Sequence, residues 1–322
     1  MNHPSRIDSL EHLHRYTLGN WNNRACVRAD HSDYVLAADL EQQLGTRHWF
    51  VPTFMPYLEH PDIQNAGRSL ALRLEANHLV YFLDYTTLLE HKIVNRAVET
   101  LIHSELGIPI PQEMKTAALQ LYTDEGYHAL FSNEVAEQVA QLYDMRNRPF
   151  MPHRVQRLLA LVEAGAPDDR ALLWFLIGFV SETVIAKELL NAARNTLVST
   201  VFTMLKSHLN DEARHSRYFC EVFCYIWPRL TPRQRSDSAK QLLVIMGIFF
   251  ESDRSWLRKS LSSVDLKPAT IEQIVTQLQQ PHAHQQRVRS GANATLFGLT
   301  RAGFFDTYAH RRLFAQAGFI DG

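Results

Sequence analysis

Cysteine, glycine and proline are scarce in this chain. Its 322 residues include three cysteines, 13 glycines and 13 prolines. Cys26, Cys220 and Cys224 form neither a disulfide framework nor a zinc-binding pattern, and such cysteine usage is typical of a reducing, cytosolic location. With few helix-breaking residues and little β-branched alternation, the helical spacing of apolar residues predicts an all-α protein.

The chain also lacks the features of membrane proteins and of nucleic-acid-binding proteins. Its longest apolar runs, residues 172–180 and 242–250, are about half the roughly 20 residues that a membrane-spanning helix needs. No apolar stretch of signal-peptide length occurs in residues 1–20. The 33 basic and 34 acidic side chains nearly balance, and no basic block could neutralise many phosphates. We therefore expect a cytoplasmic protein with no membrane and no nucleic acid among its partners.

Helix-breaking residues divide the chain into long helices without separating two cores. Asp168 or Asp169 can cap the third long helix. Shorter helices are expected between the second and third, from about Thr231 to Ser260, and from Thr270, where Thr-x-x-Gln has the pattern of a capping box. We expect one domain spanning residues 1–322, with its functional site in helices between about residues 62 and 226. The four long helices are expected at about residues 62–105 (interrupted somewhere along its length), 112–144, 168–194 and 197–227.

One short motif, Asp-Glu-x-x-His, occurs twice. The second long helix contains Asp124-Glu125-Gly126-Tyr127-His128, and the fourth repeats the pattern 87 residues later, from Asp211 to His215. Residues three apart lie on one helix face, so the Glu and His of each copy can bind the same metal ion. His208 lies one turn before Glu212 and falls within the same ~60° stripe as the second copy.

Each motif-bearing helix follows another long helix through a tight turn, and this geometry predicts two further glutamates. Residues equally far from the turn of a helical hairpin lie at equal heights. Counted from Pro109, Glu125 lies 16 residues after the turn and Glu90 lies 19 before it, whereas Glu99 lies only 10 before. Counted from Leu197, Glu182 and Glu212 each lie 15 residues away, whereas Glu188 lies 9 away. We therefore predict Glu90 and Glu182 as ligands.

The resulting set of four carboxylates and three imidazoles favours iron or manganese over structural zinc. Four carboxylates also balance the charge of two divalent ions, and bundles that bind two irons use Glu-x-x-His on two helices and one Glu from each of two others. Asp124 and Asp211 are candidate acceptors for the ring N–H of a ligand histidine; the alternative for both is a surface ion pair with a neighbouring Arg or Lys. The predicted metal ligands are Glu90, Glu125, His128, Glu182, His208, Glu212 and His215.

These motifs resemble the AurF-type family, the non-haem di-iron N-oxygenases related to p-aminobenzoate N-oxygenase and the chloramphenicol arylamine oxygenase. The resemblance runs from about residue 45 to residue 225. Histidine at position 208 favours this family, because ribonucleotide reductase small subunits, desaturases and ferritins generally lack it. The matching stretches are residues 48–52 (His-Trp-Phe-Val-Pro), Pro56, His60-Pro61, Glu90, Val94-Asn95, residues 122–128, Ser181-Glu182-Thr183 and residues 208–215.

The resemblance implies a ferritin-like four-helix di-iron bundle with additional N- and C-terminal helices. It implies two iron ions, O₂ as co-substrate, an external electron donor (a protein or a small reductant) and a homodimer. A peroxo-diferric species would oxidise a small-molecule amine to the hydroxylamine, and onward to nitroso or nitro, in a biosynthetic pathway. Glu125 and Glu212 would bridge the irons, with Glu90 and His128 on one and Glu182, His208 and His215 on the other.

Other activities of di-iron bundles remain alternatives. The same metal pair could hydroxylate or desaturate C–H bonds, or the protein could handle iron or oxidants without catalysis, as ferritins do. No sequence pattern identifies a substrate pocket: Tyr85, His91, Asn95 and Tyr127 could line one or could only pack.

Overall fold

The computed structural model describes residues 16–29, 33–146, 148, 151–278, 288 and 291–321. Within these ranges the chain is helical and has no β-strand; an isolated β-bridge joins His48 to Leu197. The predicted all-α fold is confirmed. Among the described helices, none combines the length and the apolar character that crossing a membrane would require.

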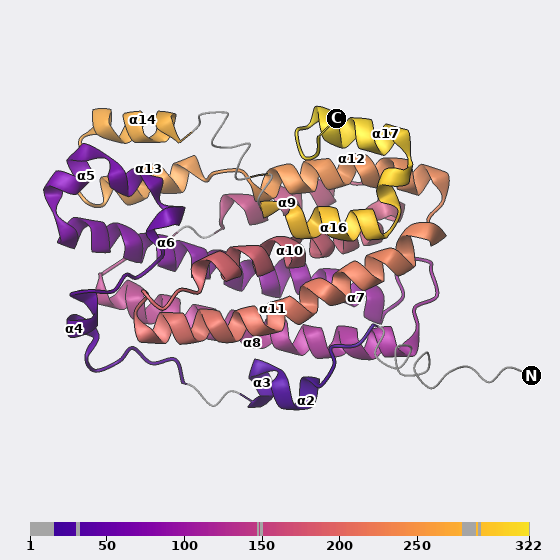
Figure 1. Cartoon of the computed structure of the whole chain (residues 1–322), viewed down its shortest axis with the longest axis horizontal. Coiled ribbons are helices and arrows are strands. Elements are labelled where there is room, and N and C mark those ends of the chain that lie inside the picture. The colour runs from indigo at the N-terminus through magenta and orange to yellow at the C-terminus, as the bar shows by residue number, and fades with distance from the viewer. Residues whose placement is uncertain are drawn as a thin grey trace, which may run out of the picture.

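Four long helical segments form the central bundle. The first is α6 (Arg68–Leu88), which continues through the π-helical turn η3 (Leu89–Val94) into α7 (Asn95–Ile102). The others are α8 (Gln112–Leu142), α10 (Arg170–Ala192) and α11 (Ser199–Ile226). Helix α8 packs on α6, α7 and α11, while α10 packs on α7 and α11. Figure 1 shows these helices running along the long axis of the molecule.

The interruption expected in the first long helix occurs at two places. Gly67 has φ +87°, a conformation that favours glycine, and separates α5 (Pro61–Ala66) from α6. The second interruption is η3, in which one extra residue widens the helix without breaking it. As a result, Glu90 lies in a turn of non-standard geometry.

Two apolar clusters form the core, and the boundary between them crosses all four helical segments. On α8 it lies between Leu121 and Phe131, and on α11 between Leu205 and Tyr218. Both gaps contain an Asp-Glu-x-x-His motif. The bundle is therefore two apolar halves with a polar layer between them.

The remaining helices cover the bundle. Helices α9 and α12 pack on α10, α13 on α6, α14 on α13, α16 on α10 and α11, and α17 on α12. Their positions are visible along the upper side of Figure 1. Their bounds are α9 His153–Ala164, α12 Pro232–Phe249, α13 Arg254–Ser262, α14 Pro268–Gln277, α16 Asn293–Arg301 and α17 Tyr308–Gln316. The 3₁₀ turns are η1 Pro52–Phe54, η2 Pro56–Glu59, η4 Pro167–Asp169, η5 Trp227–Arg229 and η6 Phe304–Asp306.

Two details of the predicted helix ends were wrong, and a third is confirmed for its position only. The helix expected over residues 231–260 is two helices, because residues 250–253 leave helical geometry between α12 and α13. Thr270 lies inside α14 and donates its hydroxyl to Asp62 at 2.6 Å; the capping box is instead formed by Thr231 and Gln234. Asp169 occupies the N-cap of α10, but its side chain makes no capping hydrogen bond.

Short helices at the N-terminal end cross the outer side of the bundle. They are α2 (Trp21–Arg24), α3 (Cys26–Ala29) and α4 (Leu40–Leu44). Helix α3 contacts both α8 and α11, and Figure 1 shows α2 and α3 below those two helices. This segment therefore lies against the two helices that contain the repeated motif.

Candidate metal centre

The structure brings all seven predicted ligands together between the two apolar clusters. Each ligand side chain is at most 1% exposed, so solvent does not reach the centre. The ligands come from four separate segments: η3, α8, α10 and α11. Both glutamates chosen from the hairpin geometry, Glu90 and Glu182, lie in this cluster, whereas Glu99 and Glu188 pair with arginines elsewhere.

Three overlapping groups of side chains have metal-binding geometry, and two of them consist of predicted ligands. The first contains Glu90, His128, His208 and Glu212, and the second contains Glu125, His128, Glu212 and His215; in each group the ligand atoms lie within 4.8 Å of one another. Glu182 is next to the second group, with its Oε2 3.6 Å from Nδ1 of His215. Because His128 and Glu212 belong to both groups, the arrangement suits two neighbouring ions.

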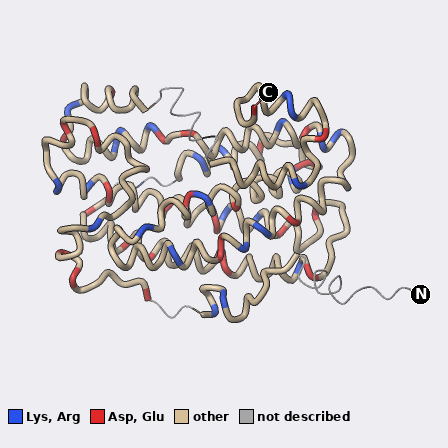
Figure 2. The backbone as a smooth tube through the Cα atoms, in the orientation of Figure 1, with Lys and Arg blue, Asp and Glu red and all other residues tan. Residues whose placement is uncertain are grey.

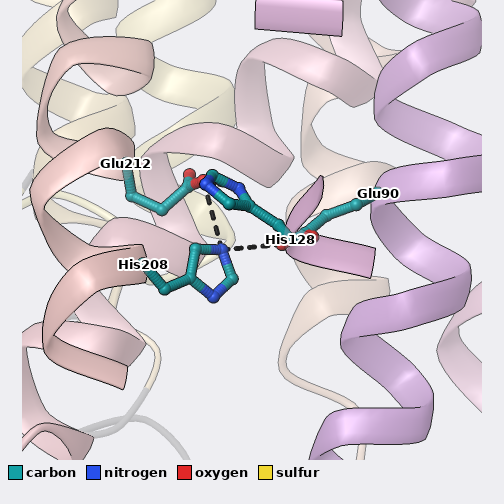
Figure 3. Close-up of side chains that lie close together, drawn as sticks. All are labelled: Glu90, His128, His208 and Glu212. Atoms are coloured by element: carbon teal, nitrogen blue, oxygen red, sulfur yellow. Dashed lines mark ion pairs between the residues drawn. The ribbon is translucent and has the colours of Figure 1, made fainter. Parts of the chain in front are cut away.

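The position of His208 bears on the pairing that the family resemblance implied, in which His208 shares an iron with Glu182 and His215. In the structure its Nε2 lies 2.8 Å from Glu90. The reason is helix geometry: His208 and His215 are seven residues, or about 10 Å, apart along α11, so they lie on opposite sides of Glu212. Figure 3 shows His208 and Glu212 extending from α11 towards Glu90 on the opposite helix.

The two aspartates cross-link the motif helices. Asp211 of α11 lies 3.0 Å from Nε2 of His128 on α8, and Asp124 of α8 lies 3.0 Å from Nε2 of His215 on α11. Each aspartate therefore accepts a ring N–H from the other motif's histidine, which leaves Nδ1 of that ring directed at the glutamates. Asp211 also pairs with Arg214, so for this residue the predicted histidine contact and the alternative ion pair both occur.

Comparison with known proteins identifies the family. A family model described as "P-aminobenzoate N-oxygenase AurF" matches residues 17–301. The chain belongs to this family. No match was found among curated proteins. The AurF family match is wider than the expected residues 45–225 at both ends, and it includes the short helices α2 and α3.

As an AurF-family member, the protein is an oxygenase of the N-oxygenase type, and its buried cluster is compatible with two iron ions. The carboxylates of Glu90 and Glu125 contact imidazoles at 2.8 Å, from Nε2 of His208 and Nδ1 of His215 respectively. Within the described part of the chain, these close contacts lack ordinary hydrogen-bond geometry, and no hydrogen bond reaches either oxygen of Glu182 or Nδ1 of His208. A buried polar atom whose hydrogen bonds are left unmade costs about 1–3 kcal/mol, and a bound cation would offset this cost. The oxygen and nitrogen donors also match the preference of iron.

The pKa values of the metal-free side chains also indicate a site for cations. Burial raises the pKa of Glu90 to about 7, even though His208 opposes the shift. Burial, together with the neighbouring Glu212 and Glu125, raises the pKa of Glu182 well above its ordinary value. Although burial alone would lower them, the pKa values of His128 and His215 are raised well above normal by the surrounding carboxylates. The cluster therefore holds protons where divalent ions would bind.

Two residues at this site were missed by the sequence analysis. The indole N–H of Trp21 donates to Asp124 at 2.9 Å, and the backbone N–H of Cys26 donates to Asp211 at 3.0 Å. Trp21 and Cys26 thus fix the two aspartates that orient the histidines. They lie 103 and 185 residues from their partners, and no local spacing links them to the motifs. The AurF family match begins at residue 17 and therefore includes both residues, which local sequence spacing does not reveal.

The four residues considered as pocket lining have different surroundings. Tyr85 and Asn95 are buried, and the ring of Tyr127 packs edge-on against Phe131. His91 directly follows the buried Glu90 in the sequence but is itself exposed. The π-helical turn therefore separates a buried Glu90 from an exposed neighbour.

Proposed function

We propose that the protein binds two iron ions through the seven clustered residues and catalyses O₂-dependent N-oxygenation of an aromatic amine. The observation that carries the proposal is the position of His208, which adds a third imidazole to a buried four-carboxylate centre in an AurF-family chain. By the family resemblance, this additional histidine distinguishes the family from other di-iron bundles.

The chain contributes charge balance, orientation and exclusion of water. Four buried glutamates offset the charge of two divalent ions, so the filled centre would be nearly neutral. Asp124 and Asp211 hold His215 and His128 with Nδ1 directed inward. The apolar residues on both sides keep bulk water away from the reacting nitrogen.

Bound iron supplies the redox chemistry that activates O₂. Conversion of an amine to a hydroxylamine inserts one oxygen atom of O₂ into an N–H bond and reduces the other to water, which consumes two electrons and two protons. The amine must present its lone pair, so we infer that the site accepts the uncharged amine. Aromatic amines satisfy this condition at neutral pH because their nitrogen is weakly basic.

Product analysis tests the proposal. The iron-loaded protein is reduced chemically and exposed to isotopically labelled O₂ with p-aminobenzoate and a panel of aromatic and aliphatic amines. We expect mass spectrometry to detect labelled hydroxylamine, nitroso or nitro products from at least one aromatic amine. The Glu182→Gln variant should give none of these products, because it removes the negative charge of a predicted metal ligand. Carbon-oxidised products alone would show a C–H hydroxylase or desaturase instead.

Iron stoichiometry separates the enzyme from an iron-storage protein. Six of the predicted ligands form two overlapping groups, with Glu182 beside the second, and this arrangement predicts about two irons per chain. Elemental analysis that finds many irons per chain, or a cage-like assembly on sizing, would favour iron handling of the ferritin type.

A further inference from the structure

A basic surface lies over the motif helix α11, on the side that α2 and α3 cover. It consists of the charged residues of α2, α3 and the segment of α11 from Lys206 to Arg217 whose side chains reach the surface, with Arg214 18% exposed and the others more so. All of them are basic, because the two acidic residues of that segment, Asp211 and Glu212, are fully buried. Figure 2 shows Lys and Arg but no Asp or Glu on the α2–α3 loop. We define this basic face as Arg24, Arg28, Lys206, Arg214 and Arg217.

Most of these charges are not neutralised locally. Within the described residues, Arg24, Arg28, Lys206 and Arg217 take part in no ion pair. Some exposed basic residues elsewhere are paired, such as Arg233 and Lys240 with Asp237, while others, such as Arg194 and Lys259, also have no ion pair among the described residues. The chain as a whole has a net charge of -1. The basic face is distinguished by the grouping of its unpaired basic side chains beside the motif helix α11, where they create a positive potential.

Two short chains of hydrogen bonds connect the basic face to the metal ligands. In one, Arg28 of the basic face lies over the ring of Trp21, 5.9 Å from its centroid, and Trp21 donates to Asp124, which contacts His215. In the other, Arg214 pairs with Asp211, which contacts His128. Both histidines direct their second ring nitrogen at the cluster. The basic face is thus joined to both groups of predicted ligands through one carboxylate and one imidazole each.

A surface hollow extends the face on one side. It has a volume of about 420 Å³ and lies between α11 and α16, where its lining includes Arg217, Arg301 and the exposed ring of Phe297. An apolar ring between two guanidinium groups suits a partner surface that combines acidic side chains with the apolar edge of a cofactor.

We propose that the basic face is the docking site of an acidic electron-transfer protein that carries an iron–sulfur cluster or a flavin. This inference rests on the proposed function, since N-oxygenation consumes two electrons that the amine and O₂ do not supply. The reduced cofactor of the partner is oxidised and the iron pair is reduced, while the protons come from solvent. Opposite charge would steer the partner to the one surface that the hydrogen-bond chains connect to the ligands.

Binding and reduction measurements test the docking site directly. The full-length, iron-loaded protein is titrated with an acidic [2Fe–2S] ferredoxin and with an acidic flavodoxin, and Kd is measured at low and high ionic strength. Stopped-flow absorbance then follows reduction of the iron pair by each reduced donor under anaerobic conditions. The test variant is Arg24→Glu with Lys206→Glu. The matched control is Arg233→Glu with Lys240→Glu on α12, which makes the same change in net charge on the opposite side of the molecule.

We expect the test variant to bind at least one donor about tenfold more weakly and to be reduced correspondingly more slowly at low ionic strength, with the difference shrinking at high salt. The control should stay within about twofold of the wild type. Dithionite, a small reductant, should reduce all three proteins equally. Equal losses in test and control variants, unchanged binding in the test variant, or no saturable binding of either donor to the wild type would overturn the proposal.

Activity driven by dithionite distinguishes this proposal from the proposed function. If amine oxidation fails with dithionite while the charge-dependent docking is observed, the proposed reaction is wrong and the docking site stands. If dithionite supports N-oxygenation but neither donor recognises the basic face, only the docking site is wrong.

Discussion

The three histidines of the cluster use different ring nitrogens. His128 and His215 direct Nδ1 at the glutamates because an aspartate holds Nε2 of each ring. His208 instead directs Nε2 at Glu90 and Glu212, at 2.8 and 3.3 Å, and its Nδ1 has no hydrogen-bond partner among the described residues. His208 is therefore oriented by its contacts with Glu90 and Glu212 and by packing, without a carboxylate at Nδ1.

We expect His208→Ala to weaken the ion beside Glu90 selectively. Loss of a residue that only supports a ligand weakens metal binding about 10–100-fold, and loss of the ligand itself should cost at least as much. Elemental analysis after desalting should show a fall from about two irons per chain towards one, with the far-ultraviolet circular dichroism unchanged. His91→Ala is the control, because His91 is exposed on the same helical segment as Glu90. Two retained irons in His208→Ala would exclude His208 as a ligand.

The aspartate contacts lead to a second prediction. Asp124→Asn keeps the side-chain shape but removes the charge that supports His215 and accepts from Trp21. We expect metal affinity to fall about tenfold, as for other residues that support ligand histidines. Competition with a coloured chelator measures the change. Asp144→Asn, at an exposed position just after the same helix, should match the wild type; equal affinities in both variants would contradict the supporting role.

The raised pKa values predict the pH dependence of the metal-free protein. Glu90, with a pKa of about 7, and Glu182, whose pKa is well above normal, bind more protons folded than unfolded, as do His128 and His215 above their ordinary pKa. Stability from these groups is lost as pH rises through the folded-state values. Metal ions must displace the same protons, so affinity rises with pH.

We therefore expect metal-free protein to unfold at a lower temperature at about pH 8 than at about pH 6, and metal binding to strengthen about tenfold or more over the same interval. Thermal scans and metal titrations at both values check the two signs. A metal-free protein that becomes more stable towards pH 8 would contradict the direction of these shifts.

At the scale of the helices, close contact between α10 and α7 positions Glu182 next to the cluster. Gly178 lies one turn before Glu182, and a Cβ added there would lie 2.5 Å from Cβ of Ala97. Alanine favours a helix by about 1 kcal/mol over glycine, but overpacking typically costs about 1–3 kcal/mol. We expect Gly178→Ala to lower the free energy of unfolding by about 1–3 kcal/mol, because a contact this short requires the helices to separate.

Gly126 provides the matched control, since a Cβ added there meets no atom within 4 Å. Gly126→Ala should raise the free energy of unfolding by about 0.5–1 kcal/mol. Urea denaturation of the metal-loaded variants measures both changes. Opposite signs for the same substitution are expected; a stabilised Gly178→Ala would show that α7 and α10 do not pack this closely.

The helical elements and the clustering of the seven predicted ligands were predictable because local spacing encodes them. Glu125 and His128 share a face within a single turn, and the hairpin count required only the position of each tight turn. Glu90 lies three residues farther from the turn at Pro109 than Glu125 does. The extra residue of the π-helical turn η3 accounts for part of that difference. The π-helical turn itself leaves no local pattern in the sequence.

Contacts between distant segments could not be predicted in the same way. The pairing of His208 with Glu90 depends on how α11 faces η3, and the aspartate contacts of Trp21 and Cys26 depend on how α2 and α3 cross the bundle. Side-chain periodicity specifies which face of a helix is buried but not which neighbouring helix it meets. These contacts are tertiary, and only the folded arrangement determines them.

At the scale of the whole molecule, the metal centre lies where two apolar halves of the bundle meet. One half contains Phe131 and Leu205, and the other contains Leu121 and Tyr218. Without metal, the layer between them holds four buried carboxylates crowded against three imidazoles, and both oxygens of Glu182 lack hydrogen-bond partners among the described residues. Burial of these polar groups is unfavourable, so without metal the contact between the two halves is weak. Bound metal ions should strengthen this contact, so that the two halves unfold together.

Removal of metal should therefore lower both the midpoint and the cooperativity of unfolding. A ligand that binds only the folded state adds about 2.7 kcal/mol when its concentration is 100 times Kd, and two ions add about twice that. By calorimetry, we expect one sharp transition for the metal-loaded protein. The chelated protein should melt several degrees lower, with a van't Hoff enthalpy below the calorimetric enthalpy because the halves unfold separately. Glu182→Gln should show little metal-dependent shift. A chelated wild type that melts as sharply and at the same temperature as the loaded protein would mean that the polar layer does not depend on bound ions.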